Sequence, residues 1–241
     1  MKTGFAIVMA LLSGAVAADV ELKFSDGTIG LVNDGRVLFG DDKGSVLFVP
    51  GDEGMILISH EERSWVRLKP GFANAVADQM QAQVDAMLAG MPPEQRAMVE
   101  QQMKGMMPPK PGEAPQMSIR KTGNSAEVAG YDCDEAEIVH ENGKVEEVVC
   151  VASAAELDIS GKDFAAMIRA MEGMAEIAAI GGAGAPQLDF DKLGGIPVRT
   201  RARDKGSDNE IVSLSTSSID ARRLEVPGSY KETSMEAMMG Q

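Results

Sequence analysis

Six short apolar runs, each ended by turn-forming residues, follow one another between residues 19 and 69. In the first run, Val20, Leu22 and Phe24 alternate with polar residues before the turn 25–27. Alternation with a period of two is typical of a strand with one buried face. Because antiparallel strands can be joined by such short turns, this region predicts an antiparallel meander. The five further strands are expected at residues 29–32, 37–39, 46–49, 55–58 and 65–68.

The apolar spacing changes to three and four residues after residue 70, which is typical of an amphipathic helix. The residues that follow this spacing in the first helix are Phe72, Val76, Met80, Val84, Met87 and Leu88. A second helix is expected over residues 94–107, because proline is tolerated in a first helical turn and Pro92 and Pro93 precede it. A third is expected over 161–180, with Ser160 and Asp163 as a capping pair.

The order of elements is strands, helices, strands, helix and strands. This order predicts an α+β fold, in which a curved antiparallel sheet or unclosed barrel has helices packed on its concave face. We expect one domain over residues 19–231, because either half alone would leave unpaired strand edges. Its parts are the meander and two helices (19–107), a proline-rich linker (108–115), and a cysteine hairpin, helix and C-terminal strands (116–231). The last of these strands are expected at 196–203, 210–215 and 219–226, before a flexible tail over 232–241.

The first residues have the features of a secretory signal peptide. A basic start is followed by an apolar run over residues 4–12 and by Ala15-Val16-Ala17, a small-x-small cleavage pattern. The apolar run is too short to span a bilayer, and no later segment is apolar enough to do so. We therefore expect residues 1–18 to be removed, with cleavage after Ala17 or Ala18, and the mature chain to be periplasmic or secreted.

An oxidising compartment favours a disulfide between the only two cysteines, Cys133 and Cys150. They flank a hairpin whose turn is expected at Asn142-Gly143, because both residues tolerate positive φ. That turn places Cys133 opposite Ala152 and Cys150 opposite Glu135, so the two cysteines share a face but are diagonal. A bulge or a shifted turn would bring the cysteines opposite each other, and we expect the disulfide to form with or without that change.

Four segments carry a resemblance to a known family: Ala129–Cys133, Val149–Ala152, Gly195–Arg199 and Val226–Tyr230. Over about residues 116–231 the chain resembles the uncharacterised bacterial family called domain of unknown function 4412. The strand-then-helix order of residues 19–107 resembles the opening half of the periplasmic lipoprotein-carrier (LolA-like) fold. In that fold an unclosed antiparallel barrel holds helices on its concave face, and acyl chains bind between them. The resemblance implies a fold and an envelope location, and it implies no catalytic residue.

Composition excludes several classes of function. The chain has 37 acidic and 23 basic residues, a net charge of −14, which disfavours nucleic-acid binding. Two histidines and two cysteines leave little material for a metal site or a Ser-His-Asp triad. The contiguous Ser59-His60-Glu61 cannot by itself form a triad, and His60 and His140 are expected at the surface. We expect no enzymatic activity, no metal and no cofactor.

The methionines, 17 in all, suggest where a ligand would bind. Thioethers are flexible and polarizable, so they suit a cavity for variable apolar ligands. We expect a non-enzymatic binding protein with an apolar or lipid-like ligand between helices and sheet. The cavity would be lined by Met80, Val84, Met87, Phe164, Ile168 and Met171. The alternative is that these side chains fill a packed core in a structural or interaction protein of the bacterial envelope.

A lesser alternative is Cu(I) binding, which thioethers favour. The methionines with suitable spacing are Met103, Met106 and Met107, and Met235, Met238 and Met239.

Arg199, Arg201 and Arg203 alternate along one expected strand, so their side chains share a face. One interpretation is a basic stripe that binds a lipid phosphate or the carboxylates of an envelope protein. The other is a solvated strand face on which each arginine pairs with a neighbouring Glu or Asp.

Overall fold

The computed structural model describes residues 19–51, 54–92, 95–96, 117–178, 188–203, 208–235 and 237. The expected signal peptide and the 108–115 linker lie outside the described residues, as does nearly all of the expected second helix. The same holds for five of the six methionines considered for Cu(I), the exception being Met235.

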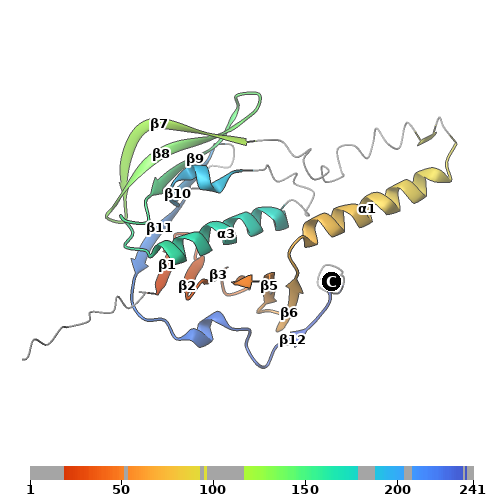
Figure 1. The fold of residues 1–241 in the computed structure, drawn as a ribbon, viewed down its shortest axis with the longest axis horizontal. Helices are drawn as coiled ribbons and strands as arrows, with labels where there is room; N and C mark the ends of the chain where they lie inside the picture. The colour runs from red at the N-terminus through yellow and green to blue at the C-terminus, as the bar shows by residue number, and fades with distance from the viewer. Residues whose placement is uncertain are drawn as a thin grey trace, which may run out of the picture.

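The described strands form one unclosed sheet in the order β12-β6-β5-β4-β3-β2-β1-β11-β10-β9-β8-β7 (Figure 1). The expected meander is confirmed by β1 (Val20–Phe24), β2 (Ile29–Asn33), β3 (Arg36–Gly40), β4 (Gly44–Val49), β5 (Gly54–Ser59) and β6 (Ser64–Leu68). The second half of the chain adds β7 (Met117–Val128), β8 (Tyr131–His140), β9 (Val145–Ala152), β10 (Ile196–Ala202), β11 (Asp208–Ser215) and β12 (Lys231–Glu232). Neighbouring described strands are antiparallel, except that β12 runs parallel to β6.

Strand β11 joins the two halves of the sheet. Its first residues, Asp208–Glu210, pair with β10, whereas Ile211–Ser215 pair with β1. The pairing with β1 is irregular between Lys23 and Phe24, where β11 changes partner. The two halves of the sheet, β12 to β1 and β10 to β7, are therefore joined through β11.

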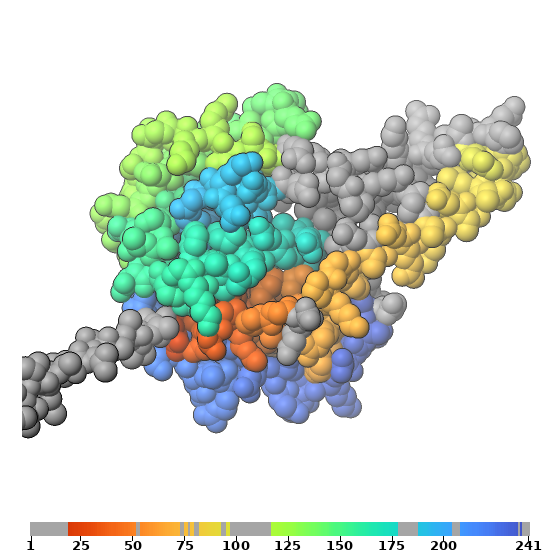
Figure 2. All heavy atoms as spheres, viewed as in Figure 1, coloured from red at the N-terminus to blue at the C-terminus, as the bar shows by residue number. Residues whose placement is uncertain are grey.

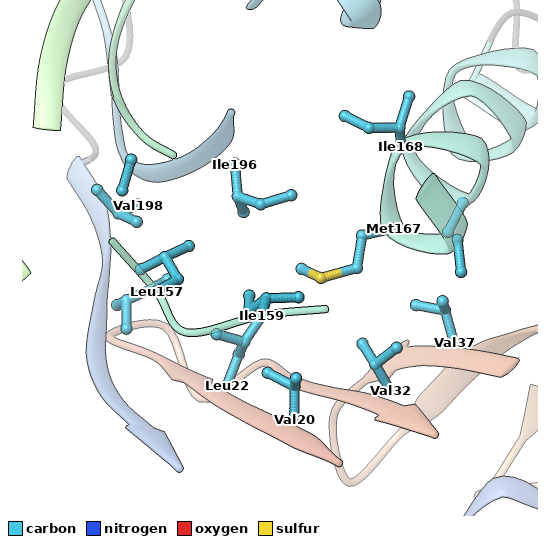
Figure 3. Close-up of a cluster of buried hydrophobic side chains, with 14 of the residues drawn as sticks. Val20, Leu22, Val32, Val37, Leu157, Ile159, Met167, Ile168, Ile196 and Val198 are labelled. Atoms are coloured by element: carbon cyan, nitrogen blue, oxygen red, sulfur yellow. The ribbon is translucent and has the colours of Figure 1, made fainter. Parts of the chain in front are cut away.

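Helix α3 (Gly161–Ala178) contributes one side of the main core. Its capping pair is as expected: the Ser160 hydroxyl donates to Asp163 Oδ2 over 2.6 Å and accepts from the Asp163 backbone N–H over 3.2 Å. The helix contacts β2, β3 and β10. Figure 3 shows Met167 and Ile168 of α3 among side chains from these and neighbouring segments. Those labelled are Val20, Leu22, Val32, Val37, Leu157, Ile159, Ile196 and Val198.

Helix α1 (Phe72–Ala89) is arranged differently. It begins after Gly71, whose φ of 77° is left-handed and suits glycine. Figure 1 shows α1 extending away from the sheet. Helix α3 thus packs against the sheet, whereas α1 extends away from it.

The disulfide between Cys133 and Cys150 is confirmed. The turn is one residue longer than the expected Asn142-Gly143, because His140 bonds to Lys144, and a bulge offsets this change before the cysteines are reached. Glu135 pairs with Cys150 and Asp134 with Val151, so the cysteines remain diagonal. Their Cα atoms are nevertheless 5.4 Å apart. The bulge in this hairpin lies between Ile138 and Val139, closer to the turn. Strand twist shortens one of the two diagonals of an antiparallel pair, which allows the bond without a shift.

The expected strand over residues 219–226 is wrong. Residues 216–235, here called the C-terminal strap, cross the sheet and contain the 3₁₀ turn η4 (Ala221–Leu224) before β12. The side chain of Asp220 accepts from the backbone N–H of Arg222, a capping bond that favours a helical turn over a strand. Glu232 and Thr233, expected in the flexible tail, instead pair with β6, where the Thr233 N–H donates to the Trp65 carbonyl over 2.8 Å.

Candidate functional site: a pocket under the C-terminal strap

The strap and α3 lie on opposite faces of the N-terminal strands. Val32 and Val37 pack with α3, whereas their neighbours Leu31 and Leu38 pack with the strap. Successive residues of a strand point to opposite faces, so the two clusters are separated by the sheet. Figure 2 shows the strap in blue along the lower side of the red and orange strands, with α3 in teal above them.

Two rows of cross-strand neighbours run over the strap face. The first row is apolar and bulky throughout and consists of Leu31, Leu38, Leu47 and Ile56. Ile219 and Leu224 of the strap belong to the same buried cluster as Leu31, Leu47 and Ile56. The strap is therefore held to the sheet by ordinary apolar packing over this row.

The second row is hollow in its middle. Ile29 pairs with Gly40, Gly40 with Ser45, and Ser45 with Ile58, so two small residues stand between two isoleucines. A Cβ at position 40 would lie 2.3 Å from the Ser45 Cβ, which explains why glycine is required there. The strap bridges this dip instead of filling it.

The result is a pocket of about 750 Å³ between the sheet and the strap. Its floor is formed by Ile29, Leu31, Leu38, Gly40, Ser45 and Ile58, and its roof by Arg222, Arg223, Glu225 and Pro227. The β1–β2 and β3–β4 turns and His60 complete the wall. The pocket is therefore amphipathic, with a largely apolar floor and a rim and roof that are mostly charged.

Three polar side chains form a chain of hydrogen bonds at this pocket. Ser45 Oγ lies 2.9 Å from His60 Nε2, and His60 Nδ1 lies 3.1 Å from the Tyr230 hydroxyl. The backbone N–H of His60 donates to the Lys43 carbonyl over 2.8 Å, which fixes the start of the β5–β6 turn. His60 was expected at the surface; it is half-buried and links β4 to the strap. Its partners are 15 and 170 positions away, so no local pattern identifies them.

Charges of both signs surround the pocket mouth. Lys43, Arg222 and Arg223 face Asp26, Asp41, Asp42 and Glu225. Asp41 accepts hydrogen bonds from the backbone N–H groups of Gly44 and Lys43, which hold the pKa of its carboxyl below the ordinary value. The Arg222 and Arg223 guanidinium groups pair with Asp220 and Glu21, respectively, at 2.7 and 2.6 Å.

The strap is also tied to the sheet by polar contacts along its length. The N–H of Ile219 donates to Asp19 Oδ2 over 2.6 Å, and Arg36 donates to the Leu224 carbonyl over 3.3 Å. The Arg223–Glu21 pair joins the strap to β1, and the hydrogen bond from Arg223 lowers the pKa of the Glu21 carboxyl. With the bond from Thr233 to Trp65 at the other end of the strap, the roof of the pocket is anchored on both sides of the hollow.

The pKa of Glu21 is lowered in the folded chain. The Arg223–Glu21 pair therefore stabilises the fold at pH values above 4.5, the ordinary pKa of a glutamate carboxyl. This contribution is lost as the pH falls through the lower folded value. We expect Glu21→Gln to be less stable than the wild type by about 0.5 kcal/mol at neutral pH, as for partly exposed pairs. The difference should vanish in acid. Urea unfolding followed by the fluorescence of Trp65, which packs under the strap, measures it. A difference that is the same at all pH values would contradict this linkage.

Of the six residues expected to line a helix–sheet cavity, the five with described side chains lie on two different helices. Ile168 is 4% exposed in the main core, and Phe164 and Met171 pack against that core. Val84 and Met87 stand on α1, where Met87 is 54% exposed. The side chain of Met80 lies outside the described residues.

The basic stripe is paired with acidic neighbours. Arg199 donates to Glu135 over 3.2 Å, Arg201 to Asp208 over 2.9 Å and Arg203 to Glu137 over 3.5 Å. The Arg199 side chain is only 12% exposed, so it is the least available of the three to another molecule. The second interpretation of these arginines, a solvated strand face with each arginine paired to an acidic neighbour, predicts this pairing.

The described residues contain neither a metal-ligand cluster nor a membrane-spanning helix. Within the part of the chain that the structure describes, no three His, Cys, Asp or Glu side chains gather as a metal site. No helix among the described residues has the length and apolar character needed to cross a bilayer.

Comparison with known proteins gives one family, and the solved structures that resemble the chain include two distant ones. The model of a domain of unknown function, DUF4412, matches residues 71–230. No curated protein matches the chain. A structure of PNGF-II in space group C2 has 11% identity and a TM-score of 0.41, covering 92% of this chain and 31% of that one. An uncharacterized conserved protein from Thermus thermophilus has 8% identity and a TM-score of 0.35, covering 90% and 91%, respectively. This chain thus spans under a third of the PNGF-II chain.

Proposed function

This chain belongs to the DUF4412 family, and we propose that it is a non-enzymatic binding protein that takes a small, largely apolar ligand in the pocket under the strap. The observation that carries the proposal is the hollow row Ile29, Gly40, Ser45 and Ile58, bridged by the strap. The volume of the pocket, about 750 Å³, is within the usual range of ligand sites, about 300–1,000 Å³.

The location of the ligand differs from that in the lipoprotein-carrier-like arrangement. There the ligand would lie between helices and sheet, where α3 already packs against Val20, Leu22 and Val37. The strap face offers apolar surface with space in front of it, and each Å² buried there would contribute about 25 cal/mol. We therefore assign the ligand to the strap face.

We propose further that the protein acts outside the cytoplasm, in the periplasm or as a secreted protein. The expected signal peptide over residues 1–18 supports this location. The disulfide between Cys133 and Cys150 is compatible with it, because such bonds persist in oxidising compartments.

Binding of the neutral fluorescent dye N-phenyl-naphthylamine tests the pocket. We expect saturable binding to the wild type and a loss of about tenfold in affinity, or about 1.4 kcal/mol, for Leu38→Trp, because the indole would fill the hollow. Val212→Trp is the matched control, since Val212 is a 55% exposed valine on β11 that does not line the pocket.

The control variant should bind the dye like the wild type. Equal affinity of the wild type and Leu38→Trp would show that the dye binds elsewhere and would contradict the proposal. So would the absence of saturable binding to the wild type.

A further inference from the structure

Ser45 provides a hydroxyl group at the floor of the strap pocket with hydrogen-bonding capacity left over. It is 6% exposed and stands between Gly40 and Ile58 in an otherwise apolar row. Within the described residues its Oγ has one hydrogen-bond partner, His60 Nε2. A hydroxyl offers one donor and two acceptor positions, so the Ser45 hydroxyl can form a further hydrogen bond besides the one to His60.

The state of His60 sets what Ser45 can offer. If Nε2 carries the proton, it donates to Ser45 Oγ, Nδ1 accepts from the Tyr230 hydroxyl, and the Ser45 proton is free to bind a ligand oxygen. If Nδ1 carries the proton, Ser45 donates to Nε2 and its Oγ can still accept from a ligand hydroxyl. In either state the pocket end suits an uncharged group that accepts or donates one hydrogen bond.

The charges at the mouth disfavour an anionic ligand. Asp26, Asp41, Asp42 and Glu225 line it, and two of its three basic side chains, Arg222 and Arg223, are already paired with Asp220 and Glu21. The net charge of −14 adds a long-range repulsion against anionic ligands.

We infer that the ligand is a neutral amphiphile, a fatty acyl ester or fatty alcohol, whose polar oxygen is bound by the Ser45 hydroxyl. This inference rests on the proposed function. The apolar chain lies on Ile29, Leu38 and Ile58. His60 and Tyr230 are positioning residues, because they orient the Ser45 hydroxyl without contacting the ligand oxygen themselves.

Displacement of bound N-phenyl-naphthylamine tests the inference. The competitors are monodecanoylglycerol, decanoate and decyltrimethylammonium, which are neutral, anionic and cationic, each below its micelle-forming concentration. We expect the neutral compound to displace the dye at a concentration about tenfold below the other two, which is about 1.4 kcal/mol. Equal displacement by all three, or stronger displacement by a charged compound, would overturn the inference.

Ser45→Ala and Tyr230→Phe locate the contact. Measured against the variant's own affinity for the dye, Ser45→Ala should lose about three- to tenfold in its preference for monodecanoylglycerol over the two charged compounds, the size of one hydrogen bond. Tyr230→Phe keeps the ring that packs against the cluster containing Ile58 and should lose about twofold, because His60 is then oriented from one side only. An unchanged preference in Ser45→Ala would refute the assignment of the polar contact.

The outcomes separate this inference from the proposed function. Dye binding that depends on Leu38 but shows no preference among the competitors supports the pocket and rejects the neutral ligand. If the dye does not bind, calorimetric titration with monodecanoylglycerol decides, and no heat of binding overturns both. An intact mass that rises by one decanoyl group in the wild type and not in Ser45→Ala would show that the Ser45 hydroxyl attacks the ester and releases glycerol, and it would overturn the binding-only proposal.

Discussion

Replacing Ile168 with alanine is expected to lower the free energy of unfolding by about 3 kcal/mol. Ile168 is 4% exposed on α3 and belongs to the cluster that joins the helix to β1, β2, β3 and β10. Removing its side chain would leave a void in packed surroundings, which adds to the lost transfer free energy. Urea unfolding followed by circular dichroism gives the difference.

The size of this loss of stability shows whether the α3 face borders a ligand cavity or a packed core. A residue that only lines a ligand cavity loses little stability on truncation, whereas a core residue loses several kcal/mol. Val212→Ala is the control, because Val212 is 55% exposed and should change stability by less than about 0.5 kcal/mol. An Ile168→Ala variant as stable as this control would show that α3 borders open space.

Removing the disulfide in a Cys133→Ala/Cys150→Ala double variant is expected to lower the free energy of unfolding by about 3 kcal/mol. The bond closes a loop between residues 17 positions apart, and the open chain gains the conformational freedom of that loop when it unfolds. Both cysteines lie in the main core, in the same cluster as Val128 and Ala152. Urea unfolding of the oxidised wild type and the double variant measures the loss.

A reducing agent provides the control for this experiment. The reducing agent should lower the free energy of unfolding of the wild type to a value near that of the double variant. It should leave the double variant unchanged, because the chain has no other cysteine. Equal stability of oxidised wild type and double variant would show that the bond adds nothing to the packing of β8 and β9.

Much of the sheet could be predicted because its strands are local. Alternation in runs such as Val20–Phe24 and the turns between them determine β1 to β6 and their antiparallel pairing. Asn142-Gly143 marked the position of the turn in the cysteine hairpin, although the turn is one residue longer than expected and a bulge restores the register at the cysteines; Ser160 with Asp163 marked the start of α3. In each case the interacting residues are close in the sequence, so one short pattern contains both partners.

The strap and its pocket could not be predicted in the same way. The run Ile219–Val226 has enough apolar residues for a strand, and the sequence does not show that Asp220 caps a helical turn instead. Met87 on α1 and Ile168 on α3 each belong to a series of apolar residues with helical spacing. Met87 is nevertheless exposed, whereas Ile168 is in the core. Helical periodicity shows which side of a helix is apolar, and it does not show what covers that side.

The sequence by itself determined the strands of the meander, the two described helices, the cysteine pair and the acidic surface, because each depends on composition or on neighbours within a few residues. Only the tertiary structure decided that Ser45, His60 and Tyr230 meet at a hollow above Gly40. The physical reason is that this site depends on contacts up to 170 positions apart, and such contacts arise only when the strap crosses the finished sheet.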